Sequence, residues 1–220
     1  MKKVLLTILA GMFLIGSAYA QPSFTIGLGL NKGVFAAEGR EENFNESGTL
    51  KTVTEEYGAF EDSYASIYVE VGNEVGSIGL AYQDDVSTPT NVNESNGDDG
   101  GTTTATSTVS ADFSGVLTLY GLVNLPMNTY LKAGIVQGDI AIGETQRSGN
   151  TYKDQDLEGY VLGFGYQHAA DAANIRFELL GHTYDDVETN NGVATTGNHN
   201  KVRISNMIGA NAQISVNRSF

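Results

Sequence analysis

Residues 23–34 read SFTIGLGLNKGV, and this stretch decides the fold class. Phe24, Ile26, Leu28 and Leu30 occupy alternate positions, and small or polar residues occupy the positions between them. A repeat of two residues predicts a β-strand with one apolar face and one polar face. A strand with an apolar face needs neighbouring strands, so the same pattern is expected elsewhere in the chain.

The same alternation appears in seven further segments of the chain, and polar, glycine-rich stretches separate them. Asn206 interrupts the apolar face of the last segment and is expected to lie beyond the membrane. The eight predicted strands are Ser23–Val34, Tyr64–Gly72, Ser77–Gln83, Asp112–Val123, Thr129–Ile142, Leu157–Gln167, Asn174–Tyr184 and Lys201–Phe220.

The connections between these segments alternate strictly between long and short. In an up-and-down barrel this order places every long connection at one rim, and every short turn at the other with both chain ends. Outer-membrane barrels are built in this way. We therefore predict an all-β, eight-stranded, antiparallel up-and-down transmembrane β-barrel, with a soluble sandwich as the alternative. The expected long extracellular loops are about 35–63, 84–111, 143–156 and 185–200.

The N-terminus has the features of an export signal. Lys2 and Lys3 precede an apolar run from Val4 to Ile15, and small residues end at Ala20. This order predicts a cleaved signal peptide over residues 1–20, and a barrel over 21–220 in the outer membrane. The alternative is an N-terminal membrane anchor, but the run is shorter than the roughly 20 residues that a spanning helix needs.

The composition is acidic and lacks cysteine. The net charge is −14, with 26 acidic and 12 basic residues, and it becomes −16 when the two lysines of residues 1–20 are removed. Such a chain has no basic surface for nucleic acid and no thiol chemistry. Asp98 and Asp99 are candidates for binding Ca²⁺, but a solvated acidic surface is the more ordinary interpretation. No cofactor is expected.

Charged residues are expected on the inward faces of the strands. Glu70, Lys132, Arg176 and Glu178 lie a few residues from the short turns, so we expect them at a similar depth and joined by salt bridges. The alternation also places Arg203 and His182 inside, in a separate layer nearer the other rim. These six residues form the predicted polar network of the interior: Glu70, Lys132, Arg176, Glu178, Arg203 and His182.

Two interpretations of this network remain open. The charges could line an ion pathway or a gate. Alternatively, they fill the interior as a polar core, which is favoured because eight strands leave a lumen just wide enough for side chains.

Aromatic residues on the outward faces cluster towards the two rims. Such girdles mark the two interfaces of a membrane barrel. The alternative is that they belong to the core of a soluble sandwich. The predicted interface aromatics are Phe24, Tyr82, Phe113, Tyr160, Tyr166, Phe177 and Phe220.

The sequence offers little support for catalysis, and we expect no enzyme. There is no G-x-S-x-G motif, and only three histidines occur. A hydrolase needs a nucleophile, a base and an orienting group in contact. A lipid-modifying site assembled around His182 from several strands is the remaining catalytic alternative.

Three stretches carry a resemblance to a known group: Gln21 leading into Ser23–Leu30, the run GFGYQ at 163–167, and ISVNRSF at 214–220. With these the chain resembles the small outer-membrane barrels that include the OmpA transmembrane domain, OmpX and the opacity proteins. The final Phe220, with apolar residues at alternate positions before it, is similar to the signal that the barrel-assembly machinery reads in that group. Arg218 and Ser219 depart from the group's aromatic-rich ending.

The resemblance implies a surface-exposed protein of the outer membrane. Its expected partners are outer-membrane lipid, the barrel-assembly machinery and an unknown extracellular ligand. The expected role is structural or in surface interaction. A small pore for ions or hydrophilic solutes is the alternative.

Overall fold

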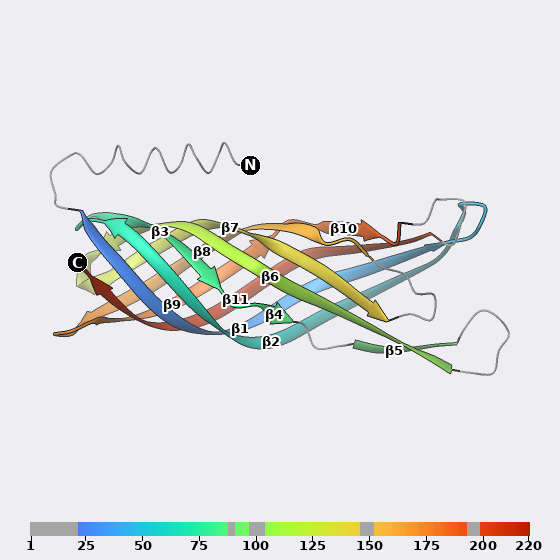
Figure 1. Cartoon of the computed structure of the whole chain (residues 1–220), viewed down its shortest axis with the longest axis horizontal. Coiled ribbons are helices and arrows are strands. Elements are labelled where there is room, and N and C mark those ends of the chain that lie inside the picture. Colours follow the sequence, from blue (N-terminus) through green and yellow to red (C-terminus); the bar gives the residue numbers. More distant parts are fainter. Residues whose placement is uncertain (1–21, 88–90, 97–103, 146–151, 193–198) are drawn as a thin grey trace.

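The computed structural model describes residues 22–87, 91–96, 104–145, 152–192 and 199–220. Within these residues an antiparallel sheet closes into a ring, because the first strand pairs with the last (Figure 1). The predicted eight-stranded up-and-down barrel is therefore confirmed. The ring consists of β1 (Ser23–Phe44), β2 (Leu50–Gly72), β3 (Gly76–Gln83), β6 (Thr104–Leu125), β7 (Thr129–Thr145), β8 (Gln155–Ala169), β9 (Asn174–Tyr184) and β11 (Asn200–Ser219).

Three short turns and Phe220 lie at one end of the barrel, which we call the short-turn end (Figure 1). One of these turns is the 3-10 helix η1 (Pro126–Asn128), in which Met127 and Asn128 both have positive φ. The opposite end, the long-loop end, carries three additional strands among the described residues. There β4 (Val86–Ser87) and β5 (Asn91–Asn96) pair with β6, and β10 (Val187–Asn190) pairs with β11.

The region from 35 to 63 differs from the sequence-based expectation of a long loop. Strands β1 and β2 continue through it as a regular hairpin, which ends in a turn at 45–49. In this turn the side chain of Asn45 accepts hydrogen bonds from the backbone N–H groups of Ser47 and Thr49. The extension was missed because its residues alternate without an apolar face, and backbone pairing needs no apolar side chains.

The other expected loops also contain strands. The segment 84–111 contains β4, β5 and the beginning of β6, and the segment 185–200 contains β10. Parts of both, and of 143–156, lie outside the described residues, as do the predicted signal peptide and the Ca²⁺ candidates Asp98 and Asp99.

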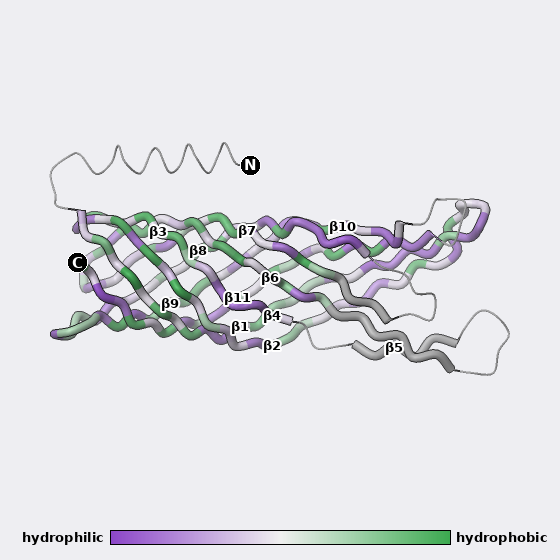
Figure 2. Tube along the Cα trace, in the orientation of Figure 1, coloured by the Kyte–Doolittle hydropathy of each residue, from purple (hydrophilic) through white to green (hydrophobic). Residues whose placement is uncertain are grey.

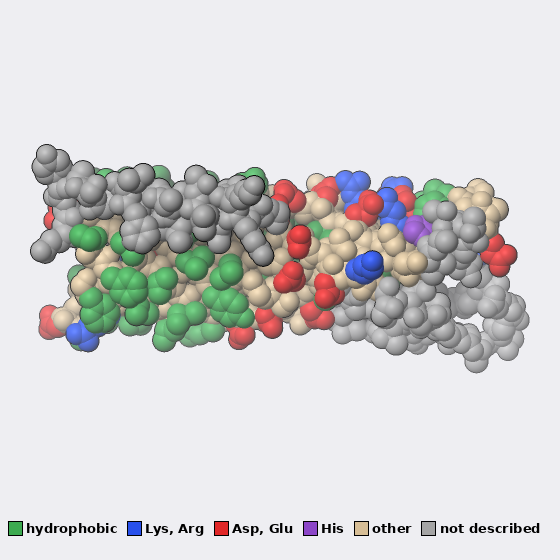
Figure 3. Space-filling model, turned by 45° about the horizontal axis from the view of Figure 1, so that its top comes forward, with side chains coloured by type: hydrophobic (Ala, Val, Ile, Leu, Met, Phe, Trp, Pro, Cys, Tyr) green, Lys and Arg blue, Asp and Glu red, His purple; other side chains and the backbone are tan. Residues whose placement is uncertain are grey.

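A continuous belt of exposed apolar side chains surrounds the half of the barrel at the short-turn end (Figures 2 and 3). On β11 it runs from Ile208 to Phe220, about 40 Å along the strand. At a tilt of about 40° this spans ~30 Å, which matches a hydrocarbon core of ~30 Å. The chain thus has the outer surface of a transmembrane barrel. The apolar belt includes Phe24, Ile26, Leu28, Leu30, Ile67, Val69, Val71, Leu80, Tyr82, Val123, Leu131, Tyr160, Leu162, Phe164, Tyr166, Phe177, Leu179, Ile208, Ile214, Val216 and Phe220.

No helix among the described residues is long and apolar enough to cross a membrane. Beyond the apolar belt the surface changes to charged and polar residues (Figure 3). Lys32 pairs with Ala212 of β11, so its exposed ion pair with Glu61, at 3.5 Å, lies within the long-loop part of the belt, on the short-turn side of Ile208. The barrel therefore continues well past the width of the belt, with a polar outer surface.

Two β-bulges reverse the inside and outside faces of their strands. On β6 the pairing shifts between Ser114 and Leu117, and Gly115 has a φ of 60°. On β11 two residues, including Asn206 with a φ of 54°, face the single residue Ala37 of β1. An extra residue moves every following side chain to the opposite face.

These bulges overturn two predictions. Phe113 was expected in the outer aromatic girdle, but it is half-buried and packs against the apolar cluster inside the barrel. Arg203 was expected inside, but its side chain is 50% exposed and hydrogen-bonds to Asp186 on the outer surface. The other six predicted aromatics are exposed: Phe24, Tyr82, Tyr160, Tyr166, Phe177 and Phe220.

Candidate functional site

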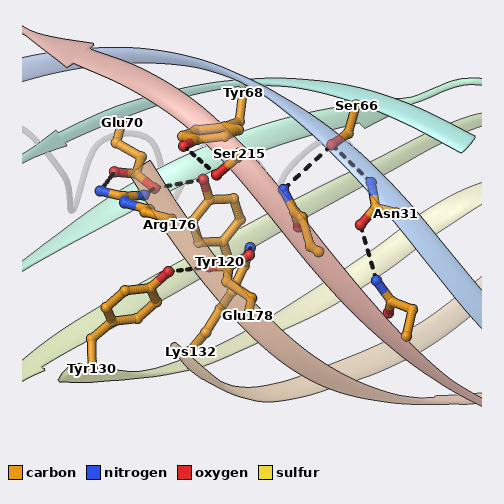
Figure 4. Close-up of polar contacts among 12 residues, drawn as sticks. Asn31, Ser66, Tyr68, Glu70, Tyr120, Tyr130, Lys132, Arg176, Glu178 and Ser215 are labelled. Carbon is orange, nitrogen blue, oxygen red and sulfur yellow. Dashed lines mark hydrogen bonds and ion pairs between the residues drawn. The ribbon is translucent and has the colours of Figure 1, made fainter. Parts of the chain in front are cut away.

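The interior near the short-turn end contains a buried ionic cluster (Figure 4). Four of the predicted charges meet there, and each is less than 10% exposed. We define the ionic cluster as Glu70, Tyr120, Tyr130, Lys132, Arg176 and Glu178.

The pair between Arg176 and Glu70 is bidentate. Arg176 Nη1 and Nη2 donate to the two carboxylate oxygens of Glu70, at 2.6 and 2.8 Å. Arg176 Nε donates to Gln167 Oε1 at 2.6 Å, and Tyr120 donates to Glu70 at 2.8 Å. The fixed fork of guanidinium suits this two-point contact, which holds both side chains in one orientation.

Glu178 receives two hydrogen bonds from β7. Lys132 Nζ donates to Oε2 at 3.0 Å, and the Tyr130 hydroxyl donates to Oε1 at 2.7 Å. Lys132 also lies 4.1 Å from the centre of the Tyr120 ring, where a cation–π contact adds to the ion pair. Two basic and two acidic groups balance, so the cluster has no net charge. The free-energy cost of removing these charges from water is offset by their ion pairs and hydrogen bonds.

Glycines on neighbouring strands make room for the tyrosines of this region. Three inward tyrosines each lie directly opposite a glycine, in the pairs Gly27 with Tyr68, Gly79 with Tyr120, and Gly165 with Tyr130. A Cβ built on any of these glycines would lie within 2.6 Å of the tyrosine ring. Each ring therefore lies across the next strand, which carries its hydroxyl towards the centre.

A second polar group, the amide cluster, lies further from the short-turn end. Asn211 Nδ2 donates to Asn31 Oδ1 at 2.9 Å, and Asn31 Nδ2 donates to Ser66 Oγ at 3.1 Å. His182 Nε2 lies 2.6 Å from Asn211 Oδ1. Because that oxygen can only accept, Nε2 carries the proton of this hydrogen bond. The amide cluster is Asn31, Ser66, His182, Asn211 and Gln213.

His182 is therefore held by an amide, and its hydrogen bond in the structure is not to a serine or a carboxylate. Its Nδ1 is buried without a hydrogen-bond partner among the described residues. The side chain of His182 borders a cavity of about 30 Å³ that Lys132 and Gln213 also line. A polar cavity of this size holds about two water molecules.

An apolar cluster fills the interior on the long-loop side of the amide cluster. Val116, Val136, Ile140 and Leu157 are almost completely buried there. The ring of Phe35 stacks on Phe60 at 5.4 Å and lies 6.5 Å from His182. The remaining buried members are Val161, Leu180, Val187 and Met207.

On the outer surface beyond the belt, Arg203 holds the pKa of the Asp186 carboxyl below its usual value through their hydrogen bond. Arg40 hydrogen-bonds to Glu42 and Glu55, and these contacts raise the pKa of its guanidinium. Among the described residues no group of three or more His, Cys, Asp or Glu is placed to hold a metal ion. Arg203 and Arg40 are therefore each paired with acidic neighbours on the outer surface.

The four charged residues of the ionic cluster could be predicted from the sequence because β2, β7 and β9 have no bulge at these residues, so their inward and outward faces alternate without interruption. The amide cluster and the glycine–tyrosine pairs were missed. Tyr68 and Tyr120 follow the inward alternation of their strands, and that parity is the signal that could have revealed them. The glycines opposite them depend on strand register, which the sequence does not state.

Fold and interior together define a small eight-stranded transmembrane β-barrel. A scan against protein-family models finds no matching family, and a search of curated proteins finds no related sequence. A search of solved structures finds several outer-membrane proteins at low identity, and 55 chains match in all.

Three of these structures are the outer membrane protease OmpT of Escherichia coli, OprG of Pseudomonas aeruginosa, and Ail of Yersinia pestis in complex with the heparin analogue sucrose octasulfate. OmpT has a TM-score of 0.42 and 8% identity over 89% of this chain and 97% of its own. OprG has a TM-score of 0.46 and 12% identity over 87% of this chain and 96% of its own. Ail has a TM-score of 0.34 and 9% identity over 84% of this chain and 98% of its own. At these values the likeness carries no argument about activity, and the barrel rests on its own strand pairing.

Proposed function

We propose that this chain is a non-enzymatic integral protein of the outer membrane, with a structural or surface-interaction role. In this proposal its own side chains close the lumen, and its long-loop end faces the cell exterior. The signal peptide at residues 1–20 directs export, and the barrel-assembly machinery inserts residues 21–220. Outer-membrane lipid surrounds the apolar belt, and an extracellular ligand contacts the long-loop end.

The ionic cluster is the observation that carries this proposal. Its hydrogen bonds join strands that are not neighbours in the ring: Glu70 on β2 meets Arg176 on β9, and Glu178 on β9 meets Lys132 on β7. Side chains that bond across the lumen occupy its cross-section. Eight strands enclose a space that side chains of this size fill, which supports a plugged interior rather than a channel.

The apolar belt supports the membrane location. A closed barrel leaves no unpaired edge in the hydrocarbon, and closed barrels of this kind are characteristic of outer membranes. Cell fractionation tests the location, because the protein should appear in outer membranes as a band whose mobility changes on heating. A protein recovered in the soluble fraction would contradict it.

The orientation is tested with intact cells. Protease added outside should cut the chain within the long-loop end, whereas the turn at Asn73–Val75 should be protected until the cells are opened. Cleavage of that turn alone would place the short-turn end outside.

The closed lumen is tested by solute flux. Liposomes that contain the barrel should not swell in iso-osmotic arabinose faster than empty liposomes. Rapid swelling would favour the alternative, a small pore for hydrophilic solutes.

The non-enzymatic assignment is supported by the bonding of His182 to Asn211 rather than to a catalytic partner. Deletion of the gene should therefore leave the chemical composition of the outer-membrane lipids unchanged. A lipid species that disappears in the deletion strain and returns with the wild-type gene, but not with His182→Ala, would establish the lipid-modifying alternative.

A further inference from the structure

Among the described residues, two basic side chains face outward within the apolar belt. Lys32 and Arg218 are both exposed, and each lies in the outward row of its strand. Lys32 lies in the long-loop part of the belt, where Glu61 pairs with it at 3.5 Å. Arg218 lies at the short-turn edge of the belt, opposite Ile26 of β1 and two residues before Phe220. The two cations are therefore at opposite edges of the lipid-facing surface.

The charge of Arg218 is not balanced within the described part of the chain. No carboxylate there forms an ion pair with it, neither Asp171 in the adjacent turn nor the C-terminal carboxylate of Phe220. An arginine that faces lipid is costly near the middle of a bilayer and costs little beside the headgroups. Glu61 balances the charge of Lys32, whereas the charge of Arg218 is left to a group outside the chain.

The side chain of Arg218 extends towards the short-turn end. Its Cζ lies 5.4 Å from the centre of the Phe220 ring, a cation–π contact. Phe220 is two positions closer to the end of the barrel, where its backbone pairs with that of Phe24. A basic side chain near the end of a membrane-spanning segment reaches the headgroup region in this way.

The donors of Arg218 are available to an anion. The guanidinium is planar and has five N–H donors, which match a phosphate at two points. Stacking over an aromatic ring uses the face of the group and leaves the N–H donors at its edges free. No hydrogen bond to another described residue occupies them. The Phe220 ring thus orients the guanidinium without competing for its donors.

We infer that Arg218 binds the phosphate group of an anionic phospholipid, in the leaflet that surrounds the short-turn end. The ring of Phe220 holds the guanidinium in place, and the acyl chains of the lipid lie against the outward side chains of Ile26 and Val216. This inference rests on the proposed function, because it needs the apolar belt to lie in a lipid bilayer.

The charge of the whole chain makes a preference for anionic lipid informative. Residues 21–220 contain 10 basic and 26 acidic residues, a net charge of −16, which disfavours general attraction to anionic lipid. Three other outer cations already have acidic neighbours: Arg40, Lys201 and Arg203. A preference for anionic lipid therefore requires a local cation at the lipid-facing surface, and Arg218 is placed to supply it.

The test uses the full mature barrel, residues 21–220, refolded from urea in a detergent that contains no phosphate. It is titrated with phosphatidylglycerol, or with phosphatidylcholine of the same chain length, and native mass spectrometry measures the lipid bound to each barrel. We expect the wild type to bind phosphatidylglycerol about tenfold more tightly than phosphatidylcholine, as one charge-assisted contact allows. Refolding in detergent makes the result independent of insertion in cells.

Three variants assign the preference to its residue. Arg218→Gln should bind the two lipids about equally. Arg218→Lys keeps the charge without the planar fork, so it should retain only part of the preference. Lys201→Gln is the matched control, because it removes the same charge from the outer surface beyond the belt, and its preference should equal that of the wild type.

Three results would overturn the inference. The first is equal binding of the two lipids by the wild type, and the second is a preference that persists in Arg218→Gln. The third is competition by soluble glycerophosphate as strong as that of the lipid, which would show a site for a free phosphate ester. A barrel that is found in outer membranes but has no lipid preference would remove this inference alone, whereas a soluble protein would remove the proposed function as well.

The position of the lipid is checked by solid-state NMR of the barrel in phosphatidylglycerol bilayers. In a two-point contact the phosphorus atom lies about 4 Å from Cζ, so phosphorus-31 should attenuate the carbon-13 signal of the Arg218 guanidinium. This signal should be missing from Arg218→Lys, which tests the contact even where Arg218→Gln does not refold. Attenuation confined to signals that remain in Arg218→Lys would place the lipid at another arginine and contradict the site.

Discussion

Glu178 accepts hydrogen bonds from Lys132 and Tyr130 inside the barrel. We expect Glu178→Ala to destabilise the barrel by about 3–5 kcal/mol, since Lys132 would remain charged and buried without its partner. Urea unfolding in detergent, followed by tyrosine fluorescence, measures the loss.

The matched control for this variant is Glu188→Ala. Glu188 pairs with Lys201 on the outer surface, where it is 52% exposed, so its loss should cost no more than about 1 kcal/mol. Equal effects of the two variants would contradict the structural role given to the ionic cluster.

The outer pair of Asp186 and Arg203 predicts a pH response. Arg203 lowers the pKa of Asp186, so the contact stabilises the folded protein above the unfolded pKa of about 3.9. That contribution is lost as the pH falls through the lower folded pKa. Carbon-13 NMR of the carboxyl should show Asp186 titrating below pH ~3.9, and Arg203→Ala should return it to the usual range. A normal titration in the wild type would show that the pair does not persist in solution.

Glycine opposite tyrosine is also a residue-scale feature that can be tested. Gly165→Ala would displace the ring of Tyr130, because the new Cβ would lie 2.2 Å from Cζ. We expect a loss of about 1–3 kcal/mol in the free energy of unfolding.

Gly181→Ala, which meets only an ordinary contact at 3.9 Å, is the control and should change stability by less than about 0.5 kcal/mol. In a Tyr130→Ala background the cost of Gly165→Ala should largely disappear, because the two effects share one contact. An unchanged cost in that background would show that the glycine is needed for another reason.

At the scale of the strand, the two bulges decide which residues face the lumen. Gly115 has a φ of 60°, a conformation that side chains with a Cβ adopt only at a cost. Gly115→Ala should therefore destabilise the barrel by about 1–2 kcal/mol, although the nearest atom, Asp139 Oδ2, leaves room at 3.7 Å.

Gly121→Ala on the same strand is the control, because its φ is ordinary and its nearest neighbour lies 4.0 Å away. Urea unfolding compares the two variants. If they are equally stable, the bulge does not need a glycine.

The bulges also explain how far the sequence could predict these elements. An apolar alternation located all eight strands, and β9 was predicted with its observed limits, Asn174–Tyr184. Phe113 and Arg203 were misplaced because each lies on the long-loop side of a bulge, where one additional residue reverses the faces. Asn206 was noticed as an interruption of the apolar face, but its positive φ is a property of the backbone that the sequence pattern does not contain.

The extension of β1 and β2 was missed for a different reason. Alternation between apolar and polar residues reports a face in contact with lipid, and the extension lies beyond the apolar belt. There Arg40, Glu42 and Glu55 form ion pairs on the surface instead. Sequence patterns of this kind therefore locate the part of a strand within the membrane and underestimate its full length.

In the molecule as a whole, the interior contains three successive clusters of side chains. The ionic cluster lies nearest the short-turn end, the amide cluster follows, and the apolar cluster closes the long-loop side. We propose that a solute would have to displace bonded side chains in the first two clusters and apolar packing in the third, so that the three clusters keep the barrel closed.

Single-channel recording of the wild-type barrel in planar lipid bilayers tests this claim most directly. We expect no stable conductance steps in 1 M KCl, and we expect openings to appear only when the ionic cluster is truncated, as in a Glu70→Ala and Arg176→Ala double variant that still folds. Regular conductance steps from the wild type that disappear in Lys132→Ala or Arg176→Ala would contradict the closed barrel and establish a pore.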